Sequence, residues 1–386
     1  MIKHPLGKNV LSKKIGNSII GYKKTKKLRK DNMTNAIIYA NKQNRIQEDV
    51  KMKFDMKKWI QDCINAPTKK AMPILSFPGI QLTGHTVDEM VRDGHLQAVC
   101  MEAIAKKFDT GAAFSLMDLS VEAEAFGSPV QYSDDEVPTV TAALIHDEEE
   151  AEALQVPEVG AGRTGECVKG IKEVSGLITD RPVLAGIIGP YSLAGRLLDM
   201  TEIMILCYEE PELVETVLEK ATEFLIKYAQ AFKDAGANGI AIAEPAAGLL
   251  SPTLIQEFST PYVQKIRDAV EDDHFMILYH NCGNVVPLLD NVKEIGVGGY
   301  SFGNAIDIEE ALKVIPQDRI VIGNIDPAGV IRNGSPELVR KETLALMERC
   351  CKYPNFVIAS GCDIPPMSPM ENIQAFFDAV EEFYNN

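Results

Sequence analysis

Short apolar runs alternate with amphipathic segments along most of the chain after residue 50. We expect these runs to be strands, because they are bounded by turn residues and rich in β-branched side chains. They fall at residues 112–117, within 130–144, and at 183–188, 239–243, 275–279, 298–302, 320–323 and 356–360. Strands that are apolar almost throughout indicate a parallel sheet covered on both faces.

Between these runs, apolar residues recur at helical spacing, and proline stands at or near the start of several segments. This pattern predicts helices at 56–64, 86–107, 194–206, 211–235, 252–270, 285–294, 308–314, 336–351 and 369–383. Eight strands alternating with helices favour an α/β fold of the (β/α)8 TIM-barrel type, with a parallel sheet closed into a barrel, over an open doubly wound sheet. No Gly-x-Gly-x-x-Gly fingerprint follows an early strand, which argues against dinucleotide binding.

Charge divides the chain into a basic start and an acidic remainder. Residues 1–30 contain ten Lys or Arg and no acid, so the rest has 39 − 10 = 29 basic against 55 acidic residues, a net charge of about −26. An acidic body of this size argues against nucleic-acid binding. We expect residues 1–50 to be a disordered extension or an overlong start, the alternative being a tail that touches RNA or a membrane. Residues 51–386 are expected to form a single barrel domain.

Hydrophobic and charged contents of 46% and 24% are ordinary for a soluble globular protein. No apolar stretch reaches the roughly 18 residues of a membrane span, and no secretory signal stands out. The eight cysteines are too sparse for a secreted disulfide scaffold. We therefore expect a reducing, cytoplasmic setting, with most cysteines buried as small hydrophobes.

Two cysteines differ from the others because each follows a predicted strand in a glycine-flanked turn. His280 and Cys282 form a His-x-Cys pair directly after the run at 275–279, and Cys362 follows the run at 356–360. Alternate residues of an extended chain point to one face, so the imidazole and the first thiol converge. One nitrogen and two sulfur ligands suit a zinc ion, and their position past strand ends suggests a catalytic ion.

Carboxylates also stand at predicted strand ends, where a (β/α)8 barrel carries its active site. Asp118 ends the first predicted strand, Glu244 the fourth, and Asp326 the seventh, while Asp363 adjoins Cys362. As candidate catalytic groups, these carboxylates could orient His280 or the substrate, and Glu244 could also be a metal ligand. Each has a plainer interpretation: Asp118 as an acceptor of backbone N–H bonds, Glu244 as a loop cap, and Asp326 as part of an Asp-Pro turn.

These residues lie in blocks that resemble the uroporphyrinogen decarboxylase superfamily from about residue 71 to the end. Within it, the chain is similar to the zinc-dependent methyltransferases that move methyl groups between corrinoid proteins and a thiol such as coenzyme M. The blocks are 72–79 (MPILSFPG), 117–127 (MDLSVEAEAFG), 189–195 (GPYSLAG), 280–283 (HNCG), 323–327 (GNIDP) and 361–366 (GCDIPP). The resemblance implies a (β/α)8 barrel with zinc held by His280, Cys282 and Cys362.

The chain departs from the decarboxylase pattern at points that matter for a tetrapyrrole substrate. The stretch at 76–79 lacks the arginines that bind substrate carboxylates in the decarboxylases, and Arg196 stands where they have a tyrosine. Asp118 does match their functional aspartate. We therefore expect methyl transfer rather than metal-free decarboxylation.

The direction of transfer stays open at the level of sequence. The first hypothesis is transfer from a methylcobamide to a thiol acceptor, and the second is transfer from a methylated O, N or S substrate to a Co(I) corrinoid. A non-catalytic corrinoid- or tetrapyrrole-binding protein with a structural zinc is a further alternative. No Asp-x-His-x-x-Gly cobalamin-binding run occurs in the chain, so the corrinoid is expected on a partner protein or free in solution.

Overall fold

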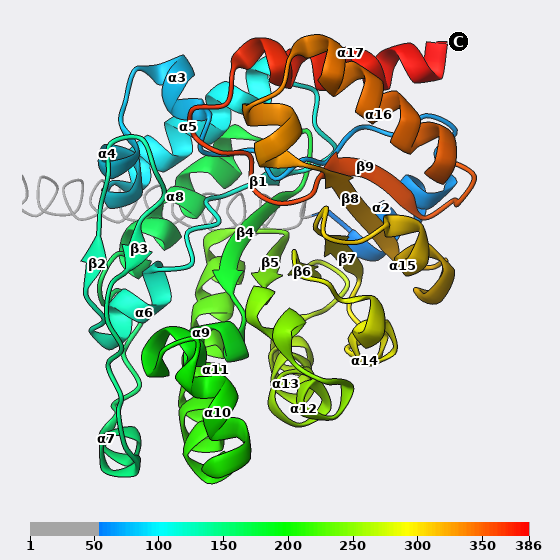
Figure 1. Cartoon of the computed structure of the whole chain (residues 1–386). Coiled ribbons are helices and arrows are strands. Elements are labelled where there is room, and N and C mark those ends of the chain that lie inside the picture. Colours follow the sequence, from blue (N-terminus) through cyan, green and yellow to red (C-terminus); the bar gives the residue numbers. More distant parts are fainter. Residues whose placement is uncertain (1–53, 386) are drawn as a thin grey trace, which may run out of the picture. The chain divides into compact units, whose positions relative to one another are not determined.

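A curled parallel sheet forms the centre of the fold in the computed structural model, which describes residues 54–385 (Figure 1). Seven strands within this range pair in the order β1-β4-β5-β6-β7-β8-β9, each parallel to its neighbour. They are β1 (Ala113–Phe114), β4 (Val183–Ile188), β5 (Gly239–Ala243), β6 (Met276–Asn281), β7 (Gly299–Phe302), β8 (Ile320–Ile325) and β9 (Phe356–Ser360). The predicted alternation of strands and helices is confirmed for these seven.

The strand expected within 130–144 does not join this sheet, so that prediction was wrong. The segment instead forms a separate antiparallel pair, β2 (Val130–Gln131) and β3 (Thr139–Val140). Acidic residues 134–136 and Pro138 separate the two short strands, and Pro138 is the only buried residue between 130 and 144. Polar residues and a proline cannot supply a continuous buried strand of a parallel sheet.

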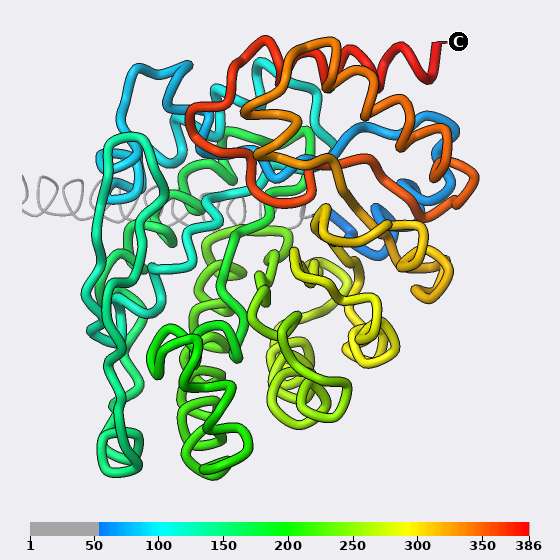
Figure 2. The backbone as a smooth tube through the Cα atoms, in the orientation of Figure 1, coloured from blue at the N-terminus to red at the C-terminus, as the bar shows by residue number. Residues whose placement is uncertain are grey.

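An irregular segment, residues 71–75, lies between the two outermost strands of the sheet (Figure 2). The Met72 N–H donates to the carbonyl of Ile358 in β9 at 3.0 Å. The carbonyl of Ala71 accepts from the N–H of Gly111, just before β1, at 2.8 Å. The structure therefore contains a seven-stranded half-barrel, and the closed barrel of eight strands is seen only in part.

The helices follow the predicted pattern, with additional breaks. Four match closely: α2 (Met56–Asn65), α11 (Pro211–Ala235), α15 (Ile308–Val314) and α16 (Pro336–Cys350). Three long predictions are each split in two, giving α4 (Val87–Arg92) with α5 (Gly94–Lys107), α9 (Pro190–Leu198) with α10 (Glu202–Glu209), and α12 (Pro252–Phe258) with α13 (Thr260–Val270). The helix predicted at 369–383 is α17 (Met370–Asn385), and the one predicted at 285–294 is the short turn η3 (Val286–Leu288) followed by α14 (Leu289–Glu294). The remaining helices are α3 (Gly79–Thr83), α6 (Val121–Phe126), α7 (Glu148–Ala153), α8 (Thr164–Leu177) and the short turns η2 (Pro245–Leu249) and η4 (Pro327–Arg332).

The breaks have local causes. Asp93 accepts a hydrogen bond from the N–H of His95 and begins a new helix, and Asp199 has a positive φ of 83° that a continuing helix cannot contain. Apolar periodicity carries across such breaks because both pieces bury the same face, so periodicity alone predicts one helix.

Alternate strand residues fill the inside of the curled sheet, and the intervening ones pack against the outer helices. The inward set includes Leu184, Ala241, Ala243, Met276, Leu278, Ile320, Ile322, Val357 and Ala359. Met56 and Ile60 of α2 join this inner cluster, and the Met56 N–H donates to the carbonyl of Asp273, just before β6, at 2.7 Å. Helix α2 therefore closes the amino-terminal end of the sheet interior, which leaves the carboxyl ends of the strands for a site.

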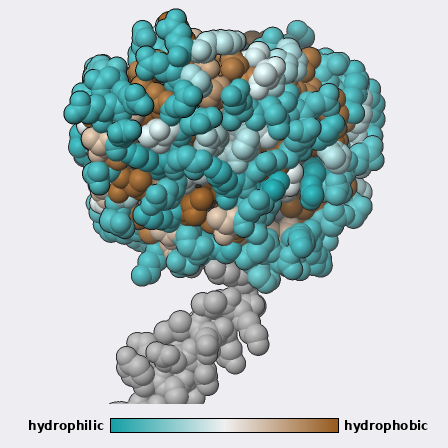
Figure 3. All heavy atoms as spheres, turned by 90° about the horizontal axis from the view of Figure 1, so that it is seen from below, coloured by the Kyte–Doolittle hydropathy of each residue, from teal (hydrophilic) through white to brown (hydrophobic). Residues whose placement is uncertain are grey.

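No helix in residues 54–385 is long and apolar enough to cross a membrane. Hydrophilic side chains cover most of the face in Figure 3, where hydrophobic atoms occur only in small separate groups. The predictions made for residues 1–50 lie outside the described residues.

Candidate metal centre

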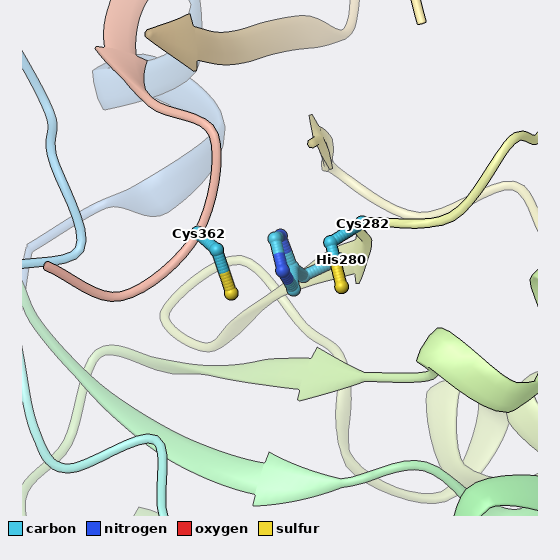
Figure 4. A group of neighbouring side chains, drawn as sticks. All are labelled: His280, Cys282 and Cys362. Atoms are coloured by element: carbon cyan, nitrogen blue, oxygen red, sulfur yellow. The ribbon is translucent and has the colours of Figure 1, made fainter. Parts of the chain in front are cut away.

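His280, Cys282 and Cys362 come together at the carboxyl ends of β6 and β9. Their ligand atoms all lie within 4.8 Å of one another. Figure 4 shows the imidazole between the two thiols in that view, with His280 and Cys282 extending from β6 and Cys362 from the loop after β9. The convergence predicted from the spacing of these residues is therefore present in the structure.

The inward direction of His280 follows from the alternation along β6. Met276 and Leu278 belong to the inner cluster, so His280, two residues further on, faces the same interior. On the neighbouring strand β7, Ser301 pairs with His280 in register, and its hydroxyl lies 2.9 Å from the imidazole Nδ1. The other ring nitrogen, Nε2, is buried and has no hydrogen-bond partner among the described residues.

An unpartnered buried nitrogen is costly, and it calls for a ligand. With Nδ1 held by a hydroxyl, Nε2 is the ring atom that is free to bind a metal ion, and hydrogen bonding of one nitrogen is the usual way to orient a histidine ligand.

The two thiols affect each other strongly. The hydrogen bond with Cys362 and the neighbouring His280 lower the pKa of the Cys282 thiol well below its ordinary value, although burial opposes this. The same hydrogen bond, with burial, raises the pKa of Cys362. The metal-free pair therefore favours one thiolate and one thiol, and a thiolate is the form that binds metal ions.

Tight turns hold Cys282 in place. The Asn281 side chain donates to the carbonyl of Glu244 at 2.6 Å and accepts from the N–H of Gly283 at 2.8 Å. The loop after β7 packs so closely that a Cβ on Gly303 would lie 2.5 Å from the Cα of Cys282. Only glycine allows this approach, which fixes the turn that carries the first thiol.

Glu244 follows β5 directly and is completely buried. Its carboxylate accepts from the Ser192 N–H at 2.6 Å, the Ser192 hydroxyl at 2.7 Å and the Tyr191 N–H at 3.2 Å. Burial raises the pKa of this carboxyl to about 7, and the hydrogen bonds oppose the shift. Glu244 thus binds the first turn of α9, and it is not among the atoms that cluster around His280.

Asp118 is held by an arginine that the sequence did not single out. One carboxylate oxygen lies 2.5 Å from Arg163 Nη1, and the other accepts from the N–H and hydroxyl of Ser120. Arg163 also binds Glu124 at 2.6 Å. Burial acts to lower the pKa of Arg163, but the two carboxylates outweigh it and raise the pKa. Asp118 is therefore part of a buried ion-pair network that fixes the loop after β1.

The remaining two aspartates differ in environment. Asp326 accepts hydrogen bonds from the N–H groups of Ala328 and Gly329, at 2.9 and 2.8 Å, and caps η4. Burial raises the pKa of Asp363 well above its ordinary value. Its two carboxylate oxygens form no well-aligned hydrogen bond with the described residues, although the backbone N–H groups of Met117 and Ile364 are close enough to act against the rise in pKa.

Sequence comparison assigns the family. The family model for uroporphyrinogen decarboxylase (URO-D) matches residues 66–383, and the chain belongs to this family. Among its relatives, a methylcobamide:CoM methyltransferase (MtbA) from Methanosarcina acetivorans is 28% identical over 329 residues, 81% of this chain and 95% of that protein. A methylcobamide:CoM methyltransferase (MtaA) from Methanosarcina barkeri is 31% identical over 271 residues, 69% and 78% of the two chains.

The fold is similar to that of a solved methyltransferase. A solved methyltransferase from Methanosarcina mazei superposes with a TM-score of 0.76 at 26% identity, covering 86% of this chain and all of the other. A uroporphyrinogen decarboxylase from Prochlorococcus marinus is 28% identical over a shorter stretch, 58% of this chain and 64% of that protein. The resemblance to this superfamily and to its methylcobamide:CoM methyltransferases is thus confirmed.

Proposed function

We propose that this chain is a zinc-dependent methyltransferase that moves a methyl group between a methylcobamide, carried by a corrinoid protein, and a small thiol of coenzyme M type. The observation that carries the proposal is the His280, Cys282 and Cys362 cluster with its unpartnered Nε2. Similarity to methyltransferases named for methylcobamide and CoM supports the substrate class.

The three residues fit a zinc ion by their chemistry. One imidazole and two sulfurs match the donor set of catalytic zinc sites, which keep a further position open. Bound there, zinc would supply the acidity that converts an acceptor thiol into a thiolate at neutral pH. Two cysteine sulfurs would reduce the positive charge on the ion, which favours generation of a nucleophile over strong Lewis acidity.

The overall reaction forms a carbon–sulfur bond and breaks the methyl–cobalt bond. The electron pair of the broken bond stays on cobalt, giving Co(I), and the proton of the thiol is released to solvent. The work of this chain is to position the reactants, since an in-line displacement depends on alignment. We also propose that residues 71–75 complete the barrel wall next to β9. All eight cysteines are free thiols, which is consistent with a reducing, cytoplasmic setting.

The carboxylates have supporting roles in this proposal. Asp118 and Asp326 act as positioning residues, one fixing the loop after β1 through Arg163 and the other capping η4. Glu244 fixes α9 beside the centre, and it becomes a fourth metal ligand only by giving up its hydrogen bonds to Tyr191 and Ser192.

The test is methyl transfer by the purified, zinc-loaded chain. We expect about one zinc per chain and loss of the methyl–cobalt absorbance when methylcobalamin is mixed with a suitable thiol. Cys282→Ala should abolish both, while Cys167→Ala, a cysteine outside the cluster, should leave the zinc content unchanged. Turnover only with a methylated donor and Co(I) would establish the reverse direction, and a metal-free chain that decarboxylates uroporphyrinogen would overturn the proposal.

A further inference from the structure

Arg196 is a half-buried cation of α9 that forms no ion pair with any carboxylate of residues 54–385. It lies in α9, four residues after Ser192, so both side chains belong to one face of that helix. Within residues 54–385, no carboxylate lies within salt-bridge distance of Arg196, and its side chain makes no hydrogen bond. Asp118 is near enough to affect Arg196 by its charge, but its carboxylate is bound by Arg163.

Two cavities meet at this arginine. One has a volume of about 230 Å³ and is lined by Leu119, Ser192, Arg196, Met200, Pro245, Ala246 and Leu249. The other has a volume of about 250 Å³ and shares Leu119 and Arg196, with Met117, Ser120 and residues 137–140 as further lining. The wall of the first cavity is mainly apolar and that of the second is mixed, with Arg196 as the single charged side chain at their shared boundary. A pocket of this kind places one polar group for orientation within apolar surroundings.

The cavities lie beside the carboxyl ends of the strands. Ser192, in the first cavity, donates its hydroxyl to Glu244 at 2.7 Å, and the N–H of Glu244 donates to the carbonyl of His280 at 2.8 Å. Pro245 and Leu249, in the same wall, belong to η2, the turn that follows β5. A few covalent and hydrogen-bonded links therefore connect Arg196 to the centre that holds His280.

The cost of this arrangement indicates a ligand. Burial lowers the pKa of Arg196, while the charge of Asp118 raises it, so the guanidinium loses hydration without gaining a direct partner. A half-buried, unpaired charge is unfavourable unless something compensates it. The whole chain carries a net charge of −16, so acidic side chains are plentiful, yet none in residues 54–385 lies within salt-bridge distance of Arg196.

We infer that Arg196 is the residue that binds the anionic group of a methyl acceptor of this coenzyme M type. This inference rests on the proposed methyl transfer and adds the determinant of its specificity. Guanidinium groups bind sulfonate-like, carboxylate and phosphate oxygens with two parallel hydrogen bonds, which gives orientation as well as affinity. The sulfur of such a thiol would then be directed from the cavity toward the metal centre.

The test compares thiols of similar size and different charge. We would measure kcat/KM for methyl transfer from methylcobalamin to 2-mercaptoethanesulfonate, neutral 2-mercaptoethanol and cationic cysteamine. The unaltered chain should prefer the sulfonate, and Arg196→Met should reduce this preference by about 10- to 100-fold, mainly through KM. The preference of Arg196→Lys for the sulfonate should lie between that of the unaltered chain and that of Arg196→Met. Arg340→Met is the matched control, because Arg340 pairs with Glu382 between α16 and α17, away from these cavities.

A second measurement does not depend on turnover. Ethanesulfonate lacks the sulfur nucleophile, and its binding can be followed by calorimetry with the full chain, zinc-loaded or metal-free. We expect binding of ethanesulfonate to be lost in Arg196→Met and kept in Arg340→Met. Circular dichroism would show whether Arg196→Met is folded, and partial binding by Arg196→Lys would show that the charge is what matters.

Different results would contradict the role of Arg196 and the proposed methyl transfer. Methyl transfer with equal kcat/KM for all three thiols would overturn the role of Arg196 and leave the proposed function in place. No transfer by zinc-loaded protein to any thiol would overturn the proposed function and the acceptor assignment with it. Methylcobinamide lacks the nucleotide phosphate of methylcobalamin. If the defect of Arg196→Met disappears when methylcobinamide is the methyl donor, the anion that Arg196 binds is the cobamide phosphate, and the inference is overturned.

Discussion

At the scale of single residues, the candidate centre depends on the alternation of side chains along two paired strands. His280 and Cys282 are two positions apart, which the sequence alone reveals, and the glycine-flanked turn of Cys362 marks the second thiol. The partner of His280 could not be predicted. Ser301 is an ordinary polar residue in a buried strand, and only the register of β6 with β7 brings it to Nδ1. For the same reason, Arg163 as the partner of Asp118 was missed, because 45 residues separate them.

Removal of the Ser301 hydroxyl should weaken metal binding without removing a ligand. In Ser301→Ala the imidazole of His280 loses the contact at 2.9 Å that fixes its orientation. Loss of such a supporting hydrogen bond typically lowers metal affinity 10- to 100-fold. Competition with a chelator would measure the zinc dissociation constant. Ser259→Ala is the control, since the Ser259 hydroxyl is buried but has no hydrogen-bond partner in the described part of the chain. Unchanged affinity in Ser301→Ala would contradict the role given to this serine.

At the scale of elements, apolar pattern predicted which segments are strands and helices better than it predicted how they connect. The parallel strands from β4 to β9 fall within a few residues of their predicted positions, because each is buried on both faces. The hairpin of β2 and β3 was taken for a sheet strand since a short apolar run does not reveal its pairing partner. Residues 71–75 were not predicted to lie beside β9, a contact that bridges nearly the whole described chain.

Glu122 shows how a buried acid can join two elements. From α6 it accepts the N–H of Ile188, at the end of β4, at 3.0 Å, while its other carboxylate oxygen is buried without a partner in residues 54–385. Burial raises the pKa of this carboxyl to about 8, with hydrogen bonding acting against the shift and the nearby charge of Asp118 adding to it. The titratable groups that face it are Asp118, Arg163, Cys167 and Tyr228.

This raised pKa predicts a pH-dependent stability. Between pH 4.5 and about 8, the unfolded chain has released the proton of Glu122 and the folded chain keeps it. Fewer protons bound in the unfolded state mean that the free energy of unfolding falls as pH rises through this window, by an amount on the order of a few kcal/mol. Glu122→Gln keeps the acceptor for Ile188 and should lose this pH-dependent component. Urea denaturation at several pH values would measure the difference.

The control for that experiment is Glu149→Gln, an exposed acid in α7. Its pH profile should parallel that of the unaltered chain. If the difference between Glu122→Gln and the unaltered chain is constant from pH 5 to 9, Glu122 does not stay protonated in the folded state.

At the scale of the whole described unit, the interior of the sheet is divided into a sealed apolar end and an end that carries the candidate metal centre. Apolar side chains of α2 and the strands fill the amino-terminal side, and His280, Cys282 and Cys362 lie at the carboxyl side. The curled parallel sheet with its covering helices was predictable because it depends on the alternation of strands and helices, whereas the closed barrel of eight strands is seen only in part. The sealing of the amino-terminal end by α2 could not be predicted, since α2 precedes the sheet in sequence and its apolar pattern does not indicate which end of the sheet it covers.

This division predicts that stability and metal binding can be changed separately. Ile60 is 6% exposed and packs in the inner cluster with Met276 and Ile320, so Ile60→Ala should lower the free energy of unfolding by about 2 to 4 kcal/mol through lost burial and a cavity. Zinc stoichiometry should stay unchanged below the unfolding transition. The contacts of Ile60 and the metal-binding side chains lie at opposite ends of β6, and each residue of a strand adds roughly 3.3 Å to the distance between them. Lys57→Ala is the control, an exposed change on the same helix that removes only a surface ion pair with Asp273. If Ile60→Ala lost zinc while still folded, the two ends would be coupled, and the metal centre would depend on the core that α2 completes.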